Sequence, residues 1–500
     1  MELFDNLMLG FSVALTLQNL GYCFIGVFLG TLIGVLPGIG PLATIAMLLP
    51  LTFSISATSA LIMLAGIYYG AQYGGSTTSI LINLPGEVAS VVTTLDGYQM
   101  AKQGRAGPAL AIAAIGSFFA GTVCTMLIAL FGPPLAELAL KFGPAEYFSL
   151  MLMGLVMAAV LAHGDMVKSL TMVGMGLLLG IIGTDINSGM ARFTFGLSEL
   201  SDGIGFIVLA VGIFAIGEIV SNLGEAEVAK REVFTSNIGS LFPTKKDLRD
   251  SALPILRGTA IGAFLGVLPG TGPAIAAFSS YMVEKKLSKD PDSFGKGNIA
   301  GVAAPEAANN ADAQCKFIPT LTLGIPSSAV MALMLGAMMI QGISPGPQVM
   351  TSNPDLFWGL VVSMWVGNLM LVILNLPLIG LWVTLLKVPY RFMFPSIMVF
   401  ACVGVYSTNN LAFDVQLAAI FGVIGFLWAV LKCQPAPMLL GFVLGPLMEE
   451  YLRRAMLLSR GDPSIFVTRP ISLGFMLVTL FILIIMILPA VRARRDSITD

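Results

Sequence analysis

Two short glycine- and proline-rich motifs in this sequence have the composition of a backbone anion-binding site. The first, Gly34–Pro41, reads Gly-Val-Leu-Pro-Gly-Ile-Gly-Pro, and it returns 232 positions later as Gly266–Pro273 with one residue changed. Proline lacks an amide hydrogen and glycine accepts backbone angles that other residues resist, so a helix is expected to end at each motif. The next helix would begin with unpaired amides and a partial positive charge, which suit a carboxylate.

The two predicted helix breaks and the polar side chains that follow them are the candidate substrate-binding residues. Hydroxyl and amide groups interrupt otherwise apolar sequence there and would supply neutral hydrogen-bond donors. The candidates are Gly38, Ile39, Gly40, Ser76, Thr77, Thr78, Gly270, Thr271, Gly272, Asn309, Asn310, Ser327 and Ser328. The alternative for the glycine motifs is tight packing without a ligand, and for the hydroxyl patch it is hydrogen bonding between helices.

Oxygen atoms near the same breaks are reasonable ligands for a hard cation such as Na⁺. The candidate ion-coupling residues are Asn83, Glu87, Asn310 and Asp312, with a possible Na⁺ site near Thr78, Asn83 and Asn310. Acidic residues inside a membrane are functional by default. The alternative for Glu87, Glu306 and Asp312 is a position in an aqueous loop. Lys316 is expected to be a snorkelling or loop charge, and neither a cofactor nor a catalytic residue is expected.

The composition places these residues in a membrane protein. Hydrophobic residues make up 56% of the 500 positions, charged residues only 11%, and the mean hydropathy is +0.89. A soluble protein has about a quarter of its residues charged. Apolar runs of roughly 20 residues, long enough to cross the hydrocarbon core, recur from end to end. We predict an all-α polytopic membrane protein of about 12 transmembrane helices, with broken helices or re-entrant hairpins.

The repeated motif divides the chain into two related halves. Residues 25–41 and 257–273 are identical at nine of seventeen positions, and both carry a GxxxGxxxG stripe that lets another helix approach closely. We predict a first half at 1–223, a polar linker at 224–253 and a second half with a final span at 254–500. The basic residues of the linker favour the cytoplasmic side. The halves are inverted or parallel according to the number of spans between them, and paired half-helix ends favour inverted repeats.

The polar segments of the two halves can also be aligned. The offset of 232 places Tyr73–Thr78 opposite Pro305–Asn310, and a slightly larger offset places Asn83–Pro85 opposite Gly324–Pro326. Each half is therefore expected to hold a broken helix, a polar patch and a proline-interrupted segment. A polar loop is expected after the first of these segments, and it contains Asp96, Lys102 and Arg105.

Several function classes are excluded by missing motifs. The ATP-binding pattern GxxxxGK[ST] is absent. The single histidine, His163, makes the zinc motif HExxH impossible, and no aspartate has a GxGD context for intramembrane proteolysis. The five cysteines show no CxxC spacing. These absences favour a secondary transporter over an ATP-driven pump or an enzyme.

Several blocks of this sequence resemble the large membrane subunit of the tripartite tricarboxylate transporters. The resemblance runs from about residue 15 to about residue 450. The blocks are Gly-Val-Leu-Pro-Gly-Ile-Gly-Pro at 34–41, Tyr-Tyr-Gly-Ala-Gln-Tyr-Gly-Gly-Ser-Thr-Thr at 68–78, Asn-Leu-Pro-Gly-Glu at 83–87, Ala-Pro-Glu-Ala-Ala-Asn-Asn-Ala at 304–311, Pro-Thr-Leu-Thr-Leu-Gly-Ile-Pro at 319–326 and Gly-Ala-Met-Met-Ile-Gln-Gly-Ile-Ser-Pro-Gly-Pro at 336–347. The polar run at 312–316 departs from the small residues expected there.

This resemblance implies a multi-pass permease of the bacterial inner membrane with about twelve spans. It implies two partners, a small membrane subunit of about four spans and a periplasmic solute-binding protein. It also implies uptake of tri- or dicarboxylates such as citrate by symport with an ion, commonly Na⁺. The alternatives are an ion or anion channel and a carrier that acts without a binding protein. A scaffold or a lipid-acting enzyme is a weaker alternative, since no nucleophile–base or metal constellation is present.

Overall fold

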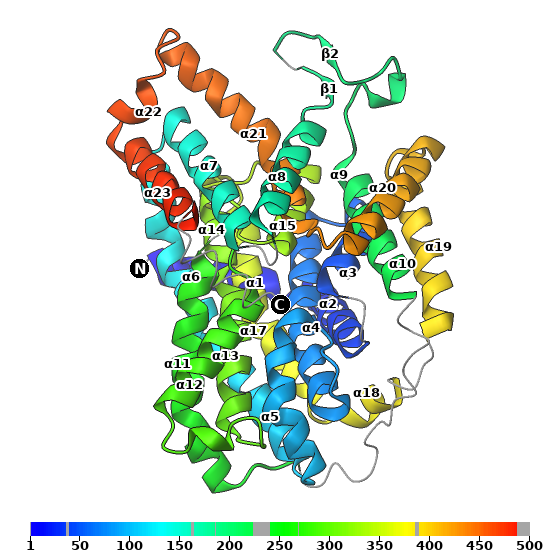
Figure 1. Ribbon diagram of the computed structural model, residues 1–500, viewed down its shortest axis with the longest axis vertical. Helices are drawn as coiled ribbons and strands as arrows, with labels where there is room; N and C mark the ends of the chain where they lie inside the picture. Colours follow the sequence, from blue (N-terminus) through cyan, green and yellow to red (C-terminus); the bar gives the residue numbers. More distant parts are fainter. Residues whose placement is uncertain are drawn as a thin grey trace.

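The computed structural model describes residues 2–36, 40–161, 165–185, 187–223, 241–268, 270–385 and 390–487, and this part of the chain is almost entirely helical (Figure 1). In the first half the elements are α1 (Glu2–Ala14), α2 (Leu17–Val35), α3 (Pro41–Leu48), α4 (Ala57–Ile82), α5 (Val91–Lys102), α6 (Ala106–Ala139), α7 (Pro144–Leu161), α8 (Met166–Gly180), β1 (Gly183–Thr184), β2 (Ala191–Arg192), α9 (Phe206–Ala210) and α10 (Gly217–Leu223). Short 3₁₀ segments cover Leu49–Ser54, Val88–Ser90 and Ser198–Leu200, and a π-helical turn covers Val211–Ile216.

The second half continues the helical pattern. Its elements are α11 (Lys245–Val267), α12 (Pro273–Leu287), a 3₁₀ turn (Pro291–Ser293), α13 (Ala300–Cys315), α14 (Phe317–Leu323), α15 (Ala329–Ile340), α16 (Val349–Ser352), α17 (Pro354–Asn375), α18 (Ile379–Leu385), α19 (Tyr390–Asn409), α20 (Ala412–Val430), α21 (Ala436–Leu458), α22 (Ile465–Thr468) and α23 (Pro470–Ile487). The all-α prediction is confirmed. Within the described residues, α2, α6, α17 and α20 are both long enough and apolar enough to cross a membrane.

The glycine stripe of α2 packs directly against the backbone of α4. A Cβ atom placed on Gly30 would lie 2.5 Å from the carbonyl oxygen of Ile67, a distance that no side chain tolerates. The same contact is made one turn earlier and one turn later, by Gly26 on Met63 and by Gly34 on Ala71. All three glycines of the stripe thus serve close helix packing, which was the alternative to ligand binding. The end of α2 lies against α4, which continues past it.

The second half repeats this contact with α11 and α13. A Cβ atom on Gly262 would lie 2.2 Å from the carbonyl oxygen of Ala308. The flanking contacts are Gly258 on Ala304 and Gly266 on Asp312. The contact partners in the two halves, such as Ile67 and Ala308, are 241 positions apart, so the offset changes from 232 on the striped helix to 241 on its neighbour. The alignment of Tyr73–Thr78 with Pro305–Asn310 is therefore wrong.

The offset of 241 also aligns the end of α4 with the end of α14. Asn83 follows α4 with φ 58°, and Gly324 follows α14 with φ 69°, so both helices end in a left-handed residue. A residue with this conformation stops a helix and turns the chain back. The alignment of Asn83–Pro85 with Gly324–Pro326 thus agrees with the backbone. In the second half, however, the equivalent of α4 is divided at Lys316 into α13 and α14.

Two segments differ from the sequence prediction. The segment with Asp96 and Lys102 is helix α5 rather than a loop, because the Asp96 carboxylate accepts backbone amides from Gly295, Gly297 and Asn298 and so docks α5 on the second half. The last part of the predicted linker is the start of α11, which begins at Lys245 with Thr244 and Asp247 forming a capping box. The rest of that linker, 224–240, and His163 lie outside the described residues.

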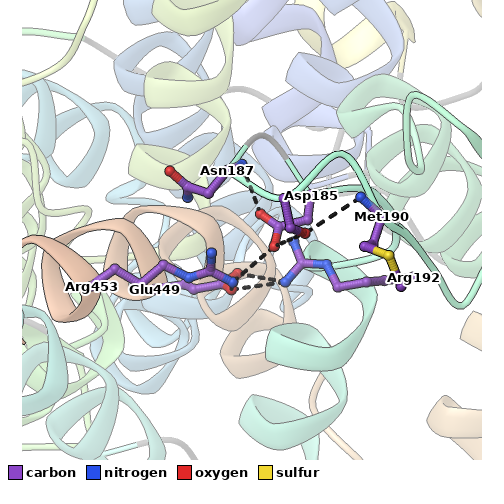
Figure 2. A network of polar contacts seen from close by, with 7 residues as sticks. Asp185, Asn187, Met190, Arg192, Glu449 and Arg453 are labelled. Carbon is purple, nitrogen blue, oxygen red and sulfur yellow. Dashed lines mark hydrogen bonds and ion pairs between the residues drawn. The ribbon is translucent and has the colours of Figure 1, made fainter.

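A small β-hairpin formed by β1 and β2 extends from one end of the helical bundle, near α8 and α21 (Figure 1). Two residues per strand cannot hold a hairpin on their own. The Arg192 guanidinium donates to both oxygens of Glu449 at 2.8 and 3.0 Å, and Arg453 donates to Glu449 at 2.7 Å and to Asp185 at 3.0 Å (Figure 2). This network attaches the hairpin to α21.

Gly30→Ala tests the close helix contact. The added methyl group would overlap the Ile67 carbonyl, so we expect a loss of roughly 1–3 kcal/mol in unfolding free energy and a lower melting temperature in detergent. Gly21→Ala is the matched control on the same helix, because nothing lies within 4 Å of its added Cβ atom. Equal melting temperatures for the two variants would mean that α2 and α4 are not in this contact.

The hairpin network should depend on pH. The amide of Asn187, the hydroxyl of Ser188 and the Arg453 guanidinium lower the pKa of Asp185 from 3.8 to about 2. The folded pKa is the lower one, so the ionised carboxylate stabilises the hairpin above about pH 4, and this contribution is lost as the pH falls towards 2.

We expect pepsin to cleave the hairpin faster as the pH drops from 4 to 2, and Asp185→Asn to be cleaved quickly throughout. Rates are corrected with a control peptide, and Asp202→Asn, which changes an exposed acid in the same loop, should behave like the wild type. A pH profile that is unchanged by Asp185→Asn would contradict the role of the network.

Candidate functional site

The two helix breaks present similar helix beginnings. Gly40 and Gly272 are the N-terminal caps of α3 and α12, and Pro41 and Pro273 are the first helical residues. Neither cap residue has a side chain that could satisfy the first amide groups. Both helices therefore start without a side-chain cap, as the motif predicts. Gly38 and Ile39 lie outside the described residues.

The surroundings of the two breaks differ. At the first break, the backbone of Gly40 is hydrogen-bonded to the carboxylate of Glu218 from α10. At the second break, a Cβ atom on Gly272 would meet nothing within 4 Å. A carboxylate of the protein itself thus occupies one of the two predicted anion positions. The sequence reasoning missed Glu218, although an acid inside the apolar run 203–222 was a visible signal.

The rest of the second break is structural. Gly270 has φ 82°, and its amide donates to the carbonyl oxygen of Ser327 at 3.0 Å. The Thr271 hydroxyl donates to the carbonyl oxygens of Leu265 and Leu268 at 2.6 and 2.8 Å and so closes the end of α11. In this conformation the Thr271 hydroxyl hydrogen is therefore used in bonds to the backbone of the same segment.

The predicted hydroxyl patch lies inside α4 and is buried. Thr78 donates to the carbonyl oxygen of Val35 at 3.0 Å, which satisfies the end of the broken helix α2. Ser76 points to the other half and donates to Glu306 at 2.5 Å. Thr77 lines a small cavity with room for about one water molecule, about 10 Å³ in volume. Its other lining residues are Tyr73, Ser76, Leu110, Ala113, Ala114, Ser117, Asn375 and Leu376.

Glu306 is a buried carboxylate held by hydroxyl groups. Its two oxygens accept from Ser76 of α4 and from Thr93 of α5, and its side chain is 1% exposed. Both donors are neutral and both come from the first half. The loop alternative for Glu306 is wrong. Thr93 was not among the predicted residues, because its helix was expected to be a polar loop.

Glu87 is a second buried carboxylate with neutral donors. It accepts from the amide of Ala89 at 3.1 Å and from Asn309 Nδ2 at 3.1 Å. With its amide oriented to donate, Gln72 adds a third contact at 2.8 Å. The side chain is 8% exposed, so the loop alternative is wrong here too. Gln72 and Asn309 come from different halves, and Glu87 therefore joins them.

Asp312 and Lys316 form an ion pair, and the side chains of both are 0% exposed. The expectation that Lys316 is a snorkelling or loop charge is wrong, because the helix that carries it is covered on all sides. Asp312 Oδ1 has no hydrogen-bond partner among the described residues. Lys316 also lies close enough to Glu87 for an electrostatic interaction.

The remaining candidates are more dispersed. Asn310 donates to Ser117 of α6 at 2.7 Å and is buried. Ser327 donates to the carbonyl oxygen of Lys316 at 3.4 Å, and Ser328 caps α15. Asn83 is exposed at the end of α4. No group of three or more His, Cys, Asp or Glu side chains suited to a metal ion occurs in the part of the chain that the structure describes.

Ser76, Glu87, Glu306 and Asn309 of this buried cluster lie in the sequence blocks that resemble the transporter family. A comparison with known families agrees with that resemblance. The model of the tripartite tricarboxylate transporter TctA family matches residues 20–440. The chain belongs to the TctA family.

Relatives of this TctA-family chain are found in Agrobacterium vitis. One is described as an uncharacterized 52.8 kDa protein in the TAR-I ttuC' 3' region; it is 58% identical over 498 residues, covering 100% of this chain and 99% of the relative. Another, an uncharacterized protein in the TAR-II ttuC' 3' region, is 58% identical over 237 residues, or 47% of this chain and 98% of the relative. No solved structure matches this chain. The family is one of membrane transporters with partner subunits.

Replacing Glu306 by glutamine should relieve an uncompensated buried charge. The side chain keeps its size, and its hydroxyl partners remain able to bond, so we expect a higher melting temperature for Glu306→Gln than for the wild type in sodium-free buffer. Sodium chloride should narrow that difference if a cation compensates Glu306. Glu199→Gln, a change on the surface, is the control. A lower melting temperature for Glu306→Gln would show that the charge is already balanced.

Proposed function

We propose that this TctA-family protein is the permease subunit of a secondary active transporter that imports tri- or dicarboxylates such as citrate. The observation that carries the proposal is the buried polar cluster built by α4, α5 and α13 beside two broken helices. A buried, charged cluster at the junction of two halves is expensive in a membrane protein and is typical of a substrate and ion pathway. The break at Gly272, whose amides are free of side-chain caps, is the position that we assign to a substrate carboxylate.

We infer that the two halves are inverted repeats in a protein of about twelve spans. The support is an exchange of partners between equivalent helices: α5 packs on α12, and α15 packs on α3. These two pairs lie at different levels along the long axis of the molecule, with α5 and α12 near one end (Figure 1). A two-fold axis in the membrane plane generates such an exchange, and an axis along the membrane normal would put both pairs at one level.

The coupling ion in this proposal is Na⁺, and the mechanism is alternating access. Glu87 and Glu306 are held by neutral donors alone, so a monovalent cation or a proton would lower the cost of burying them. Thr78, Asn310 and the broken-helix carbonyls add oxygen ligands of the kind a hard cation prefers. Asn83 is a weaker candidate because it is exposed.

The proposed setting is the bacterial inner membrane, with the linker predicted at 224–253 on the cytoplasmic side. A small membrane subunit and a periplasmic solute-binding protein are the proposed partners, in agreement with the three parts in the family description. The alternatives are a channel and a carrier that acts without a binding protein. No contact in the described residues favours a channel or an independent carrier.

Uptake by proteoliposomes tests the proposal. The vesicles contain this chain with its small subunit, and labelled citrate and a panel of dicarboxylates are supplied with and without an inward Na⁺ gradient and the binding protein. Uptake that requires both supports a tripartite secondary transporter. Flux that requires neither would favour a channel or an independent carrier, and gradient-driven uptake without the binding protein would remove that partner from the proposal.

Asn310→Leu should weaken cation coupling. The change removes the amide that donates to Ser117 and an oxygen that could bind the ion. We expect a several-fold rise in the Na⁺ concentration for half-maximal uptake, with the dependence on substrate little changed. Ser117→Ala is the control for the loss of the hydrogen bond alone. An Na⁺ dependence like that of the wild type in Asn310→Leu would remove Asn310 from the coupling site.

A further inference from the structure

The described residues contain one lysine or arginine that is completely buried, Lys316. Three other buried acids are compensated by arginines. Glu146, Asp247 and Glu284 each pair with an arginine whose side chain is partly exposed, namely Arg469, Arg105 and Arg257. Asp96 accepts three backbone amides. The cluster around α13 thus has a different charge balance, with three carboxylates, Glu87, Glu306 and Asp312, and one ammonium group.

The alignment of the two halves shows which first-half residue corresponds to Lys316. At the offset of 241, Lys316 is equivalent to Gly75 of α4, and Glu87 is equivalent to Ser328. In the first half the helix contributes no side chain, and a Cβ atom on Gly75 would lie 2.8 Å from Cγ of Glu87. In the second half the helix supplies the charged side chain, and the segment after it supplies only the small Ser328. The large side chain thus follows the helix in the first half and lies on the helix in the second half, and its charge is negative in the first half and positive in the second.

We propose that Lys316 is a built-in counter-ion that takes the place of one coupling cation. Its ammonium group pairs with Asp312, which has no other hydrogen-bond donor on its second oxygen among the described residues. Asp312 is therefore neutralised by the protein. Lys316 also interacts electrostatically with Glu87, but the ion pair that the structure shows is with Asp312. Glu87 and Glu306 accept hydrogen bonds from neutral donors, so they need external cations or protons. This inference rests on the proposed cation coupling and adds to it that Lys316 limits the number of cations bound.

The number of buried charges predicts how many cations each variant should bind. Lys316→Gln leaves Asp312 without its partner, so one more cation should bind. The double variant Asp312→Asn with Lys316→Gln removes both charges, so the number of bound cations should return to that of the wild type. Lys286→Gln, which changes an exposed lysine of α12, is the control.

Two measurements are made on these variants in the complete complex. In proteoliposomes, the Hill coefficient of uptake for Na⁺ should rise by about one in Lys316→Gln and return to the wild-type value in the double variant. In detergent, the melting temperature should rise more steeply with the logarithm of the Na⁺ concentration in Lys316→Gln, because each extra cation bound by the folded state adds to this slope. The second measurement gives an answer even where uptake is too slow to follow.

The outcomes separate the two proposals. A wild-type protein whose uptake does not depend on any cation would overturn the proposed coupling. The same melting slope for the wild type, Lys316→Gln and Lys286→Gln would overturn the role of Lys316, whatever drives uptake. A double variant that keeps the steep slope of Lys316→Gln would also overturn it, because Asp312 would then not be the group that binds the added cation.

Discussion

The contact between a glycine stripe and a neighbouring backbone underlies the whole arrangement. A helix that ends at membrane depth leaves carbonyl and amide groups unpaired, and lipid cannot satisfy them. Here α2 and α11 end beside α4 and α13, and the stripes bring the backbones so close that a methyl group at Gly30 or Gly262 would overlap a carbonyl oxygen. Thr78 can then reach Val35 and satisfy its carbonyl group. The broken helices are thus supported by helices that run past them.

The same close packing explains how a charged cluster can be buried. Once α4 and α13 are fixed by the stripes, their other faces carry Ser76 and Glu306 towards each other, and α5 brings Thr93. Glu306 accepts from two residues of the opposite half, and Glu87 accepts from Asn309 of the opposite half. A movement of one half against the other would therefore change the hydrogen bonds of these charged groups.

Much of this was predictable from the sequence. The two helix breaks and the two glycine stripes follow from the positions of glycine and proline, which act locally. Other features depend on contacts between distant residues. The helix α5 was expected to be a loop because Asp96 looks polar in sequence, whereas its charge is satisfied by amides near Gly295. Glu218 and Lys316 were misjudged or missed for the same reason: a single charge in an apolar run does not reveal its partner.

The exchange of Gly75 and Glu87 for Lys316 and Ser328 bears on how such a chain could arise by duplication. Two copies of the first half would hold two Glu87 side chains and no Lys316, and two copies of the second half would hold two Lys316 side chains and no Glu87. A protein made of two identical halves of either kind would therefore lack the present balance of charges. The two halves have become complementary in charge, so neither can replace the other.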